Sequence, residues 1–196
     1  MDLHERLREH LANRSRTALA RGTRCAVLVP LLADSPGYRL LYTLRSEHLP
    51  SHRGQVAFPG GKHSSGDADL LATALREAHE EVGIAATDVD ILGPLDDVYT
   101  AVSDFVVTPY VGLLPAVYPL RANPAEVSDL FTVTLDALED PAHRETQQRQ
   151  HGSIAFEVEA ITAGTHTIWG VTHRITCNFL ECISELRSRA GERPKT

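Results

Sequence analysis

Apolar and polar positions divide the chain into strand-like and helix-like stretches. Short apolar runs at 25–32 and 38–45, separated by an Asp-Ser-Pro-Gly turn at 34–37, predict a β-hairpin. The same pattern of short apolar runs between turn residues predicts further strands downstream. These lie at 55–58, 89–93, 98–99, 105–114, 126–134, 153–158 and 165–169.

Helical spacing of apolar residues marks both ends of the chain. Leu3, Leu7 and Leu11 predict an amphipathic helix over about 2–20, and the spacing of Ile175 and Phe179 predicts a closing helix over about 170–189. A short helix is expected at 135–139. Residues 139–152 are strongly polar and have no periodic apolar face, so we expect an exposed loop of a length that is often functional.

The segment 60–84 joins a glycine turn to a helix with two unlike faces. With about 100° between successive residues, its apolar side chains fall on one side of the helix. The other side carries three carboxylates, those of Glu77, Glu80 and Glu81. Asp67 and Asp69 are candidate N-caps, and Gly83 is the expected C-terminal cap.

Carboxylates at positions i, i+3 and i+4 of a helix repel one another by a few tenths of a kcal/mol per pair. The simplest interpretation of such a cluster is a solvated acidic face. A divalent cation would turn the repulsion into attraction, and carboxylate oxygens suit Mg²⁺ or Mn²⁺, which also bind substrate phosphates. The cluster therefore indicates a candidate metal site for phosphate chemistry.

Composition and charge narrow the classes of function. The 196 residues are 42% hydrophobic and 23% charged, as in an ordinary globular protein. The net charge of −7 argues against broad binding to nucleic acid or anionic membranes, so an anionic substrate would need a metal and a locally basic pocket. Three cysteines without a CxxC pair and an N-terminus without an apolar signal lead us to expect reduced thiols and a cytoplasmic location.

The acidic helix resembles a known motif, the Nudix box, in Gly61, Asp67 and the run Arg-Glu-Ala-His-Glu-Glu-Val-Gly-Ile at 76–84. The box has Glu where this chain has Asp67, and eight residues rather than the usual seven separate Asp67 from Arg76. The extra residue falls before the helix or in its first turn. The resemblance implies one domain over 1–196, an α/β protein with the Nudix-type α/β/α sandwich and a mixed sheet, and the order of predicted elements is compatible with it.

A second stretch resembles the coenzyme A pyrophosphatase branch of the Nudix family. It reads Leu-Tyr-Thr-Leu-Arg-Ser at 41–46 and His-Arg-Gly-Gln-Val-Ala-Phe-Pro-Gly-Gly at 52–61. The branch commonly has Leu where Tyr42 stands, and an arginine where Pro50 stands, for which Arg53 is a candidate substitute. A weaker echo of the branch is Ile-Trp-Gly-Val-Thr at 168–172.

The resemblance also implies roles for individual residues. Glu77, Glu80 and Glu81, with the carbonyl of Gly61, would bind Mg²⁺ or Mn²⁺, and Glu77 and Glu81 rank highest because they are four residues apart. Arg76 would orient one of these glutamates. The residues implied to receive the substrate phosphates are Arg45, Arg53, Lys62, Gly60 and Gly61.

Two roles stay open at this point. The proton acceptor could be Glu77, Glu80 or a group of the polar stretch 139–152, such as Glu145 or His143. Trp169 and Tyr99 could stack on an adenine ring, although core packing is the simpler role for Trp169.

The implied reaction is metal-dependent hydrolysis of the diphosphate of coenzyme A or its derivatives to phosphopantetheine and adenosine 3′,5′-bisphosphate. One alternative is a Nudix pyrophosphatase with another nucleoside diphosphate substrate, such as NADH or ADP-ribose. Another is a non-catalytic module that binds a nucleotide and regulates a partner. The acidic triplet favours an enzyme, because a binding module does not need mutually repelling glutamates.

Overall fold

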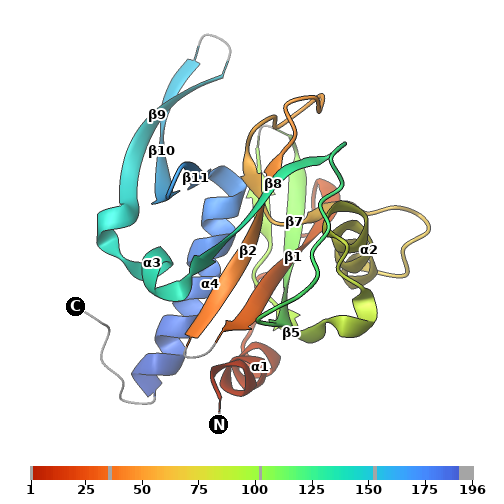
Figure 1. The fold of residues 1–196 in the computed structure, drawn as a ribbon, viewed down its shortest axis with the longest axis vertical. Helices are drawn as coiled ribbons and strands as arrows, with labels where there is room; N and C mark the ends of the chain where they lie inside the picture. Colours follow the sequence, from red (N-terminus) through yellow and green to blue (C-terminus); the bar gives the residue numbers. More distant parts are fainter. Residues whose placement is uncertain (1, 35–36, 102, 152–153, 190–196) are drawn as a thin grey trace.

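A mixed eight-stranded sheet lies at the centre of the molecule (Figure 1). The computed structural model describes residues 2–34, 37–101, 103–151 and 154–189. Strands follow the order β3-β2-β1-β7-β5, while β4 pairs with β1, β6 with β7 and β8 with β2. The elements are α1 (Leu3–Asn13), β1 (Thr23–Asp34), β2 (Gly37–Arg45), β3 (Val56–Ala57), β4 (Gly60–Lys62), α2 (Leu70–Val82), η1 (Ala86–Asp88), β5 (Asp90–Pro94), β6 (Val98–Thr100), β7 (Phe105–Pro115), β8 (Val127–Thr134), α3 (Leu135–Glu139), η2 (Pro141–His143), β9 (Arg144–His151), β10 (Ile154–Ala163), β11 (His166–Trp169) and α4 (Gly170–Arg189).

Strand β1 lies in the middle of the sheet, between β2 and β7, and both of its faces are buried. It runs parallel to β7 from Thr23 opposite Phe105 to Ala33 opposite Pro115. Such strands are continuous apolar runs, as the sequence of β1 is. On its other side β1 pairs antiparallel with β2, which confirms the predicted hairpin, although residues 35 and 36 of its turn lie outside the described ranges.

Helices cover the two faces of the sheet, with α2 on one side and α4 on the other (Figure 1). Successive side chains of a strand point to opposite faces, so β1 contributes to two cores. Leu28 and Leu32 pack with the apolar face of α2, whereas Val29 and Leu31 belong to the core that includes Phe179 of α4. This arrangement confirms the predicted α/β/α sandwich with a mixed sheet.

The N-terminal helix is shorter than predicted. It buries Leu7 and Leu11 but ends at Asn13, and Arg14 is already extended at φ −81° and ψ 149°. Beyond Asn13, backbone N–H groups donate hydrogen bonds to carboxylate side chains and not to the carbonyl groups of a continuing helix. Thr17 donates to Asp96 at 2.6 Å, and Leu19 donates to the neighbouring Asp97 at 2.8 Å.

The closing helix α4 has the predicted range, and it buries Ile175 and Phe179. The three cysteines form no disulfide in the part of the chain that the structure describes. Among the described residues, no helix has the length and apolarity that crossing a membrane requires.

A second, three-stranded sheet has the order β11-β10-β9, and its β9–β10 hairpin extends beyond the body of the molecule (Figure 1). The prediction of a loop over 139–152 was therefore wrong. Residues 141–143 form a short 3-10 helix, and residues 144–151 pair antiparallel with β10. Most of β9 is exposed, so the alternation of apolar and polar residues that identifies a half-buried strand is missing from its sequence.

Candidate active site

Helix α2 is fixed at both ends by the residues that its sequence predicts. The side chain of Asp69 accepts a hydrogen bond from the N–H of Ala72 at 2.8 Å, and Gly83 ends the helix in the left-handed conformation. Ala74, Ala78 and Val82 are fully buried against the sheet. The opposite face of the helix is thereby turned toward the turn that contains Gly60 and Gly61.

Glu81 is the most buried of the three glutamates, with only 3% of its side chain exposed. The N–H of Gly60 donates to its Oε2 at 3.2 Å, and Nη1 of Arg45 lies 3.7 Å from its Oε1. Burial raises the pKa of Glu81 to about 8, against the opposing effect of Arg45. Arg45 and the N–H of Gly60 offset only part of the cost of burying this carboxylate, so a bound cation would stabilise its charged form.

Glu77 lies beside Gly61 and is also largely buried. A Cβ atom at Gly61 would be 2.5 Å from Oε1 of Glu77, so the absence of a side chain at Gly61 lets this carboxylate lie against the backbone. At Gly60 a Cβ atom would be 2.4 Å from the carbonyl oxygen of Ala26. Burial raises the pKa of Glu77, and Arg76 partly opposes this effect.

Arg76 links Asp67 to the glutamates of the helix. Its guanidinium donates to both carboxylate oxygens of Asp67, at 2.8 and 3.0 Å, and its Nη1 donates to Glu77 at 2.9 Å and to Glu80 at 3.0 Å. These bonds hold the pKa of Asp67 well below its usual range. Half of the Glu80 side chain is exposed, so this glutamate is turned toward Arg76 and the solvent.

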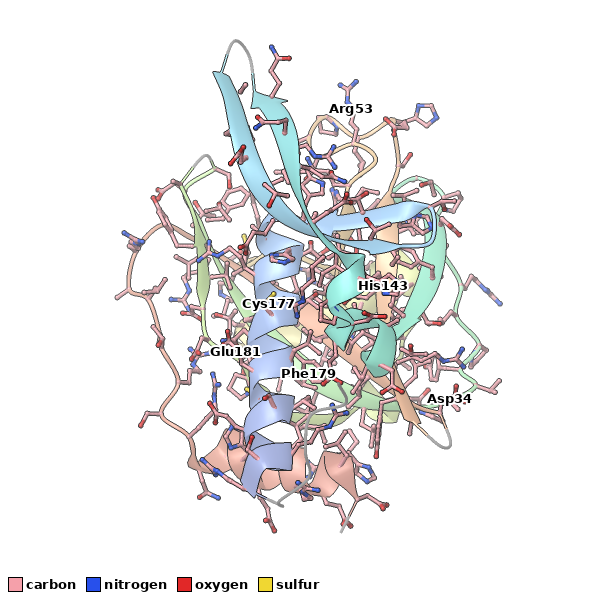
Figure 2. The ribbon with its side chains drawn as sticks, turned by 90° about the vertical axis from the view of Figure 1, so that its left-hand side faces the viewer. Asp34, Arg53, His143, Cys177, Phe179 and Glu181 are labelled. Carbon is pink, nitrogen blue, oxygen red and sulfur yellow. The ribbon has the colours of Figure 1, made fainter. Side chains whose placement is uncertain are left out.

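Of the predicted phosphate-binding cations, the structure brings Arg45 to the glutamates. Arg53 donates to the carbonyl of Leu49 at 2.7 Å and projects from the end of the molecule (Figure 2). Nζ of Lys62 lies 4.8 Å from the centre of the Phe105 ring. Neither of these two side chains has a described contact with the α2 glutamates.

Comparison with known proteins identifies the family to which the chain belongs. A family model described as "NUDIX domain" matches residues 22–153, which is more than half of the chain. The chain belongs to the Nudix hydrolase family. It is 38% identical over 172 residues to the uncharacterized Nudix hydrolase NudL of Yersinia pestis (strain Pestoides F), covering 84% of this chain and 82% of that protein. NudL of Yersinia pseudotuberculosis serotype O:1b (strain IP 31758) has the same identity and coverage.

Solved structures support the same fold. The chain superposes on a MutT/nudix family protein from Enterococcus faecalis with a TM-score of 0.59 at 16% identity, over 97% of this chain and 75% of that one. A MutT protein from Methanosarcina mazei Go1 gives a TM-score of 0.50 at 16% identity, over 90% of this chain and all of that one.

Nudix hydrolases generally use divalent ions such as Mg²⁺ or Mn²⁺, and the residues of this Nudix protein fit such an ion. Within the ranges that the structure describes, no three His, Cys, Asp or Glu side chains already form a metal site, and Glu80 is held by Arg76. Glu77 and Glu81 are nevertheless buried carboxylates on one face of α2, and the Glu77 carboxylate lies directly against the backbone of Gly61. Hard oxygen donors of this kind are the ligands that Mg²⁺ and Mn²⁺ prefer.

Glu126 is a further carboxylate that influences the glutamates of α2, and it lies outside the Nudix box and its flanking residues. It immediately precedes β8, and its carbonyl accepts a hydrogen bond from the N–H of Ser46 at 2.8 Å, next to Arg45. Its charge contributes to the raised pKa values of both Glu77 and Glu81. A single glutamate before a strand has no distinguishing pattern, so the sequence contains no signal that Glu126 acts on the glutamates of α2.

The two loop residues considered as proton acceptors lie with the second sheet. Glu145 on β9 accepts a hydrogen bond from Gln147 at 2.6 Å and another from Thr162. Nδ1 of His143 in η2 is 2.8 Å from the carbonyl oxygen of Ala137. Both side chains are therefore engaged away from α2.

The two aromatic candidates also differ in their surroundings. The ring of Tyr99 is covered by the guanidinium of Arg21 at 3.6 Å, and its hydroxyl donates to Asp104 at 3.1 Å. Trp169 is partly exposed, and Arg149 of the β9–β10 hairpin lies over its ring.

Proposed function

We propose that this Nudix hydrolase cleaves the diphosphate of coenzyme A or its derivatives, releasing phosphopantetheine and adenosine 3′,5′-bisphosphate. The observation that carries the proposal is the position of Arg45 at 3.7 Å from Glu81. Arg45 belongs to the stretch 41–46 that resembles the coenzyme A branch, and Glu81 belongs to the Nudix box. A residue that recognises the substrate and a residue that binds the metal would therefore lie side by side in one site.

Glu77, Glu81 and the carbonyl of Gly61 would hold Mg²⁺ or Mn²⁺, with Glu80 at the outer side. Such an ion, when bound, neutralises charge on the diphosphate and lowers the pKa of a coordinated water. Arg76 holds Glu77 and Glu80 in place through the two hydrogen bonds described above. Arg45 supplies a fixed positive charge for a phosphate oxygen at the inner end of the site.

We assign the proton acceptor to Glu126. Among the described residues, its carboxylate has neither a hydrogen-bond donor nor an ion-pair partner, and its charge reaches both Glu77 and Glu81. A base must be deprotonated and free to accept the proton of the attacking water. Glu126→Gln is expected to lower kcat by about 100-fold or more, the usual range for a lost general base. A kcat and pH profile like those of the wild type would remove Glu126 from this role.

The proposal is tested by mass identification of the products from coenzyme A in ¹⁸O-labelled water, with Mg²⁺ or Mn²⁺ present. We expect phosphopantetheine and adenosine 3′,5′-bisphosphate, with the label on one of them identifying the phosphorus that is attacked. The Glu81→Gln variant is the control for cleavage by a contaminating enzyme. Intact coenzyme A after prolonged incubation with either metal would overturn the proposal.

One observation favours a second candidate substrate. Pro50 replaces an arginine that the coenzyme A branch commonly has, and Arg53, its candidate substitute, donates to the carbonyl of Leu49. A site with one basic contact fewer would suit another nucleoside diphosphate derivative, such as NADH or ADP-ribose. Comparison of kcat/KM for these compounds and coenzyme A under one set of conditions separates the candidates. Metal-dependent cleavage of any of them excludes a purely regulatory binding module.

A further inference from the structure

The outer face of the second sheet carries aromatic and cationic side chains. Across the β9–β10 hairpin Arg149 pairs with Phe156, and Ala160 of β10 pairs with Trp169 of β11. Residues paired in this way, and those two positions apart along a strand, lie on the same face of a sheet. The opposite face contains Ile161 and Ile168, which are fully buried in the core. Trp169, Arg149 and Phe156 therefore share the other face, on which Phe156 is exposed, Trp169 and Arg149 are partly exposed and Ala160 is buried.

A chain of hydrogen bonds holds Arg149 over Trp169. The guanidinium carbon lies 4.9 Å from the centre of the indole ring. Nη2 of Arg149 donates to Gln147 at 2.6 Å, and Gln147 in turn donates to Glu145 at 2.6 Å. Glu145, Gln147 and Arg149 are each two residues apart on β9, so their side chains lie on one face of the strand and the first two hold the guanidinium of the third in place.

Arg149 retains donor capacity for a ligand. Its Nε is shielded from solvent and has no hydrogen-bond partner, and no carboxylate of the described residues lies within ion-pair distance of its guanidinium. Guanidinium groups bind phosphate through paired, charge-assisted hydrogen bonds. Phe156 adds apolar surface on the same face, and 37% of it is exposed.

The end of β11 that carries Trp169 is linked to the candidate active site through the first turn of α4 and β3. Thr172, three residues after Trp169, donates to the carbonyl of Val56 at 2.8 Å. Gly60, four residues after Val56, donates its N–H to Glu81. Since successive Cα atoms are about 3.8 Å apart, Val56 lies at most about 15 Å from Gly60. The β9–β10 hairpin and the loop before β3 also project from the same end of the molecule (Figures 1 and 2).

We propose that Trp169 and Arg149 form the subsite for the adenosine 3′-phosphate end of the substrate. The adenine ring would stack on this pair, because aromatic rings and guanidinium planes both stack on bases, and Arg149 would bind the 3′-phosphate. This inference rests on the proposed coenzyme A hydrolysis. It assigns to the second sheet a recognition role that neither Arg53 nor Lys62 fills in the structure.

The binding test uses the fact that Trp169 is the single tryptophan of the chain. Adenosine 3′,5′-bisphosphate is titrated into the full-length protein, and tryptophan fluorescence is recorded. We expect a saturable change, with affinity for adenosine 5′-monophosphate about tenfold lower because it lacks the 3′-phosphate contact. Phosphopantetheine, which lacks the base, is expected to leave the fluorescence unchanged.

Arginine variants on the two faces of β9 give a matched comparison. Arg149→Gln is expected to weaken adenosine 3′,5′-bisphosphate about tenfold and to remove the preference over adenosine 5′-monophosphate. Arg144→Gln, on the opposite face of the same strand, is expected to bind as the wild type does. Equal affinities of the wild type and Arg149→Gln would overturn the role of Arg149.

Kinetics test Trp169 itself. Trp169→Leu is expected to raise KM for coenzyme A by about tenfold, the loss of one base-stacking contact, with little change in kcat. Trp169→Phe, which retains an aromatic ring, is expected to restore most of the affinity. A KM for Trp169→Leu equal to that of the wild type would overturn the stacking role.

The outcomes separate this inference from the proposed function. If coenzyme A is cleaved and equilibrium dialysis shows nucleotide binding without a change in tryptophan fluorescence, the subsite is overturned while the proposed function stands. If adenosine 3′,5′-bisphosphate changes the fluorescence but coenzyme A is not cleaved, the subsite stands and the substrate assignment fails. The absence of both binding and cleavage overturns both.

Discussion

Arg76 donates two parallel hydrogen bonds to Asp67, from Nε to Oδ1 at 2.8 Å and from Nη2 to Oδ2 at 3.0 Å. The same guanidinium binds Glu77 and Glu80. Asp67 therefore takes part in the network although it replaces the glutamate of the Nudix box and is separated from Arg76 by one extra residue. The N–H of Ser64 and the hydroxyl of Thr73 also donate to Asp67, at 3.0 and 2.9 Å.

Asp67→Asn should lower activity because a neutral amide cannot form the bidentate ion pair that positions Arg76. We expect kcat/KM to fall about 10- to 100-fold, as is typical when a partner behind the metal ligands is lost. Asp69→Asn, two residues away, is the matched control, since asparagine also caps helices well. Equal losses in the two variants would show that the effect is not specific to the Asp67–Arg76 pair.

Glu81→Gln should lower kcat by at least about 100-fold, because it removes a charge at the reacting centre while the amide oxygen can still accept the N–H of Gly60. At about pH 5 the melting temperature should stay near that of the wild type, because Glu81, whose pKa is raised to about 8, is then protonated and as neutral as glutamine of the same volume. Glu80→Gln should have a smaller effect, because Glu80 is half exposed and bound to Arg76. Activity near the wild-type level in Glu81→Gln would exclude Glu81 from the metal site, and isothermal titration with Mn²⁺ would check the same point directly.

The raised pKa of Glu81, about 8, predicts how stability depends on pH when divalent metal is removed with a chelator. Between the pKa of an unfolded-state glutamate, about 4.3, and 8, the native state holds a proton that the unfolded state has lost. The contribution of Glu81 is therefore fully present below this window and is lost as the pH rises through it, by about 1.4 kcal/mol per pH unit. The free energy of unfolding of the wild type minus that of Glu81→Gln, measured by denaturant titration from pH 5 to 8, should decrease steadily. A difference that is independent of pH would contradict the raised pKa.

Gly61→Ala should displace the Glu77 carboxylate, because the added Cβ atom would lie 2.5 Å from its Oε1. A displacement of about 1 Å at a catalytic group can cost about 100-fold in rate, so we expect a loss of that order in kcat. Gly66→Ala is the matched control, since no atom lies within 4 Å of a Cβ atom at that position. Steady-state kinetics and far-ultraviolet circular dichroism of the two variants would distinguish a displaced carboxylate from a misfolded protein.

The sequence was sufficient wherever structure depends on neighbours along the chain. The range of α4, the caps Asp69 and Gly83 of α2, and the β1–β2 hairpin follow from spacing and turn chemistry, which act over a few residues. The same local reasoning failed for β9, because an exposed strand shows no apolar alternation, and for residues after Asn13, because Asp96 and Asp97 capture their backbone donors.

The sequence by itself determined the family and the carboxylate set of α2, because the spacing of Glu77, Glu80 and Glu81 fixes one helix face. Only the tertiary structure decided which residues from other elements join that face. Arg45 and Glu126 reach the glutamates because β2 and β8 are paired there, while Arg53 and Lys62, nearer in sequence, point elsewhere. Burial, which raises the pKa of Glu81, is likewise a property of the packed sheet and helix, because it depends on side chains that surround the carboxylate from several elements.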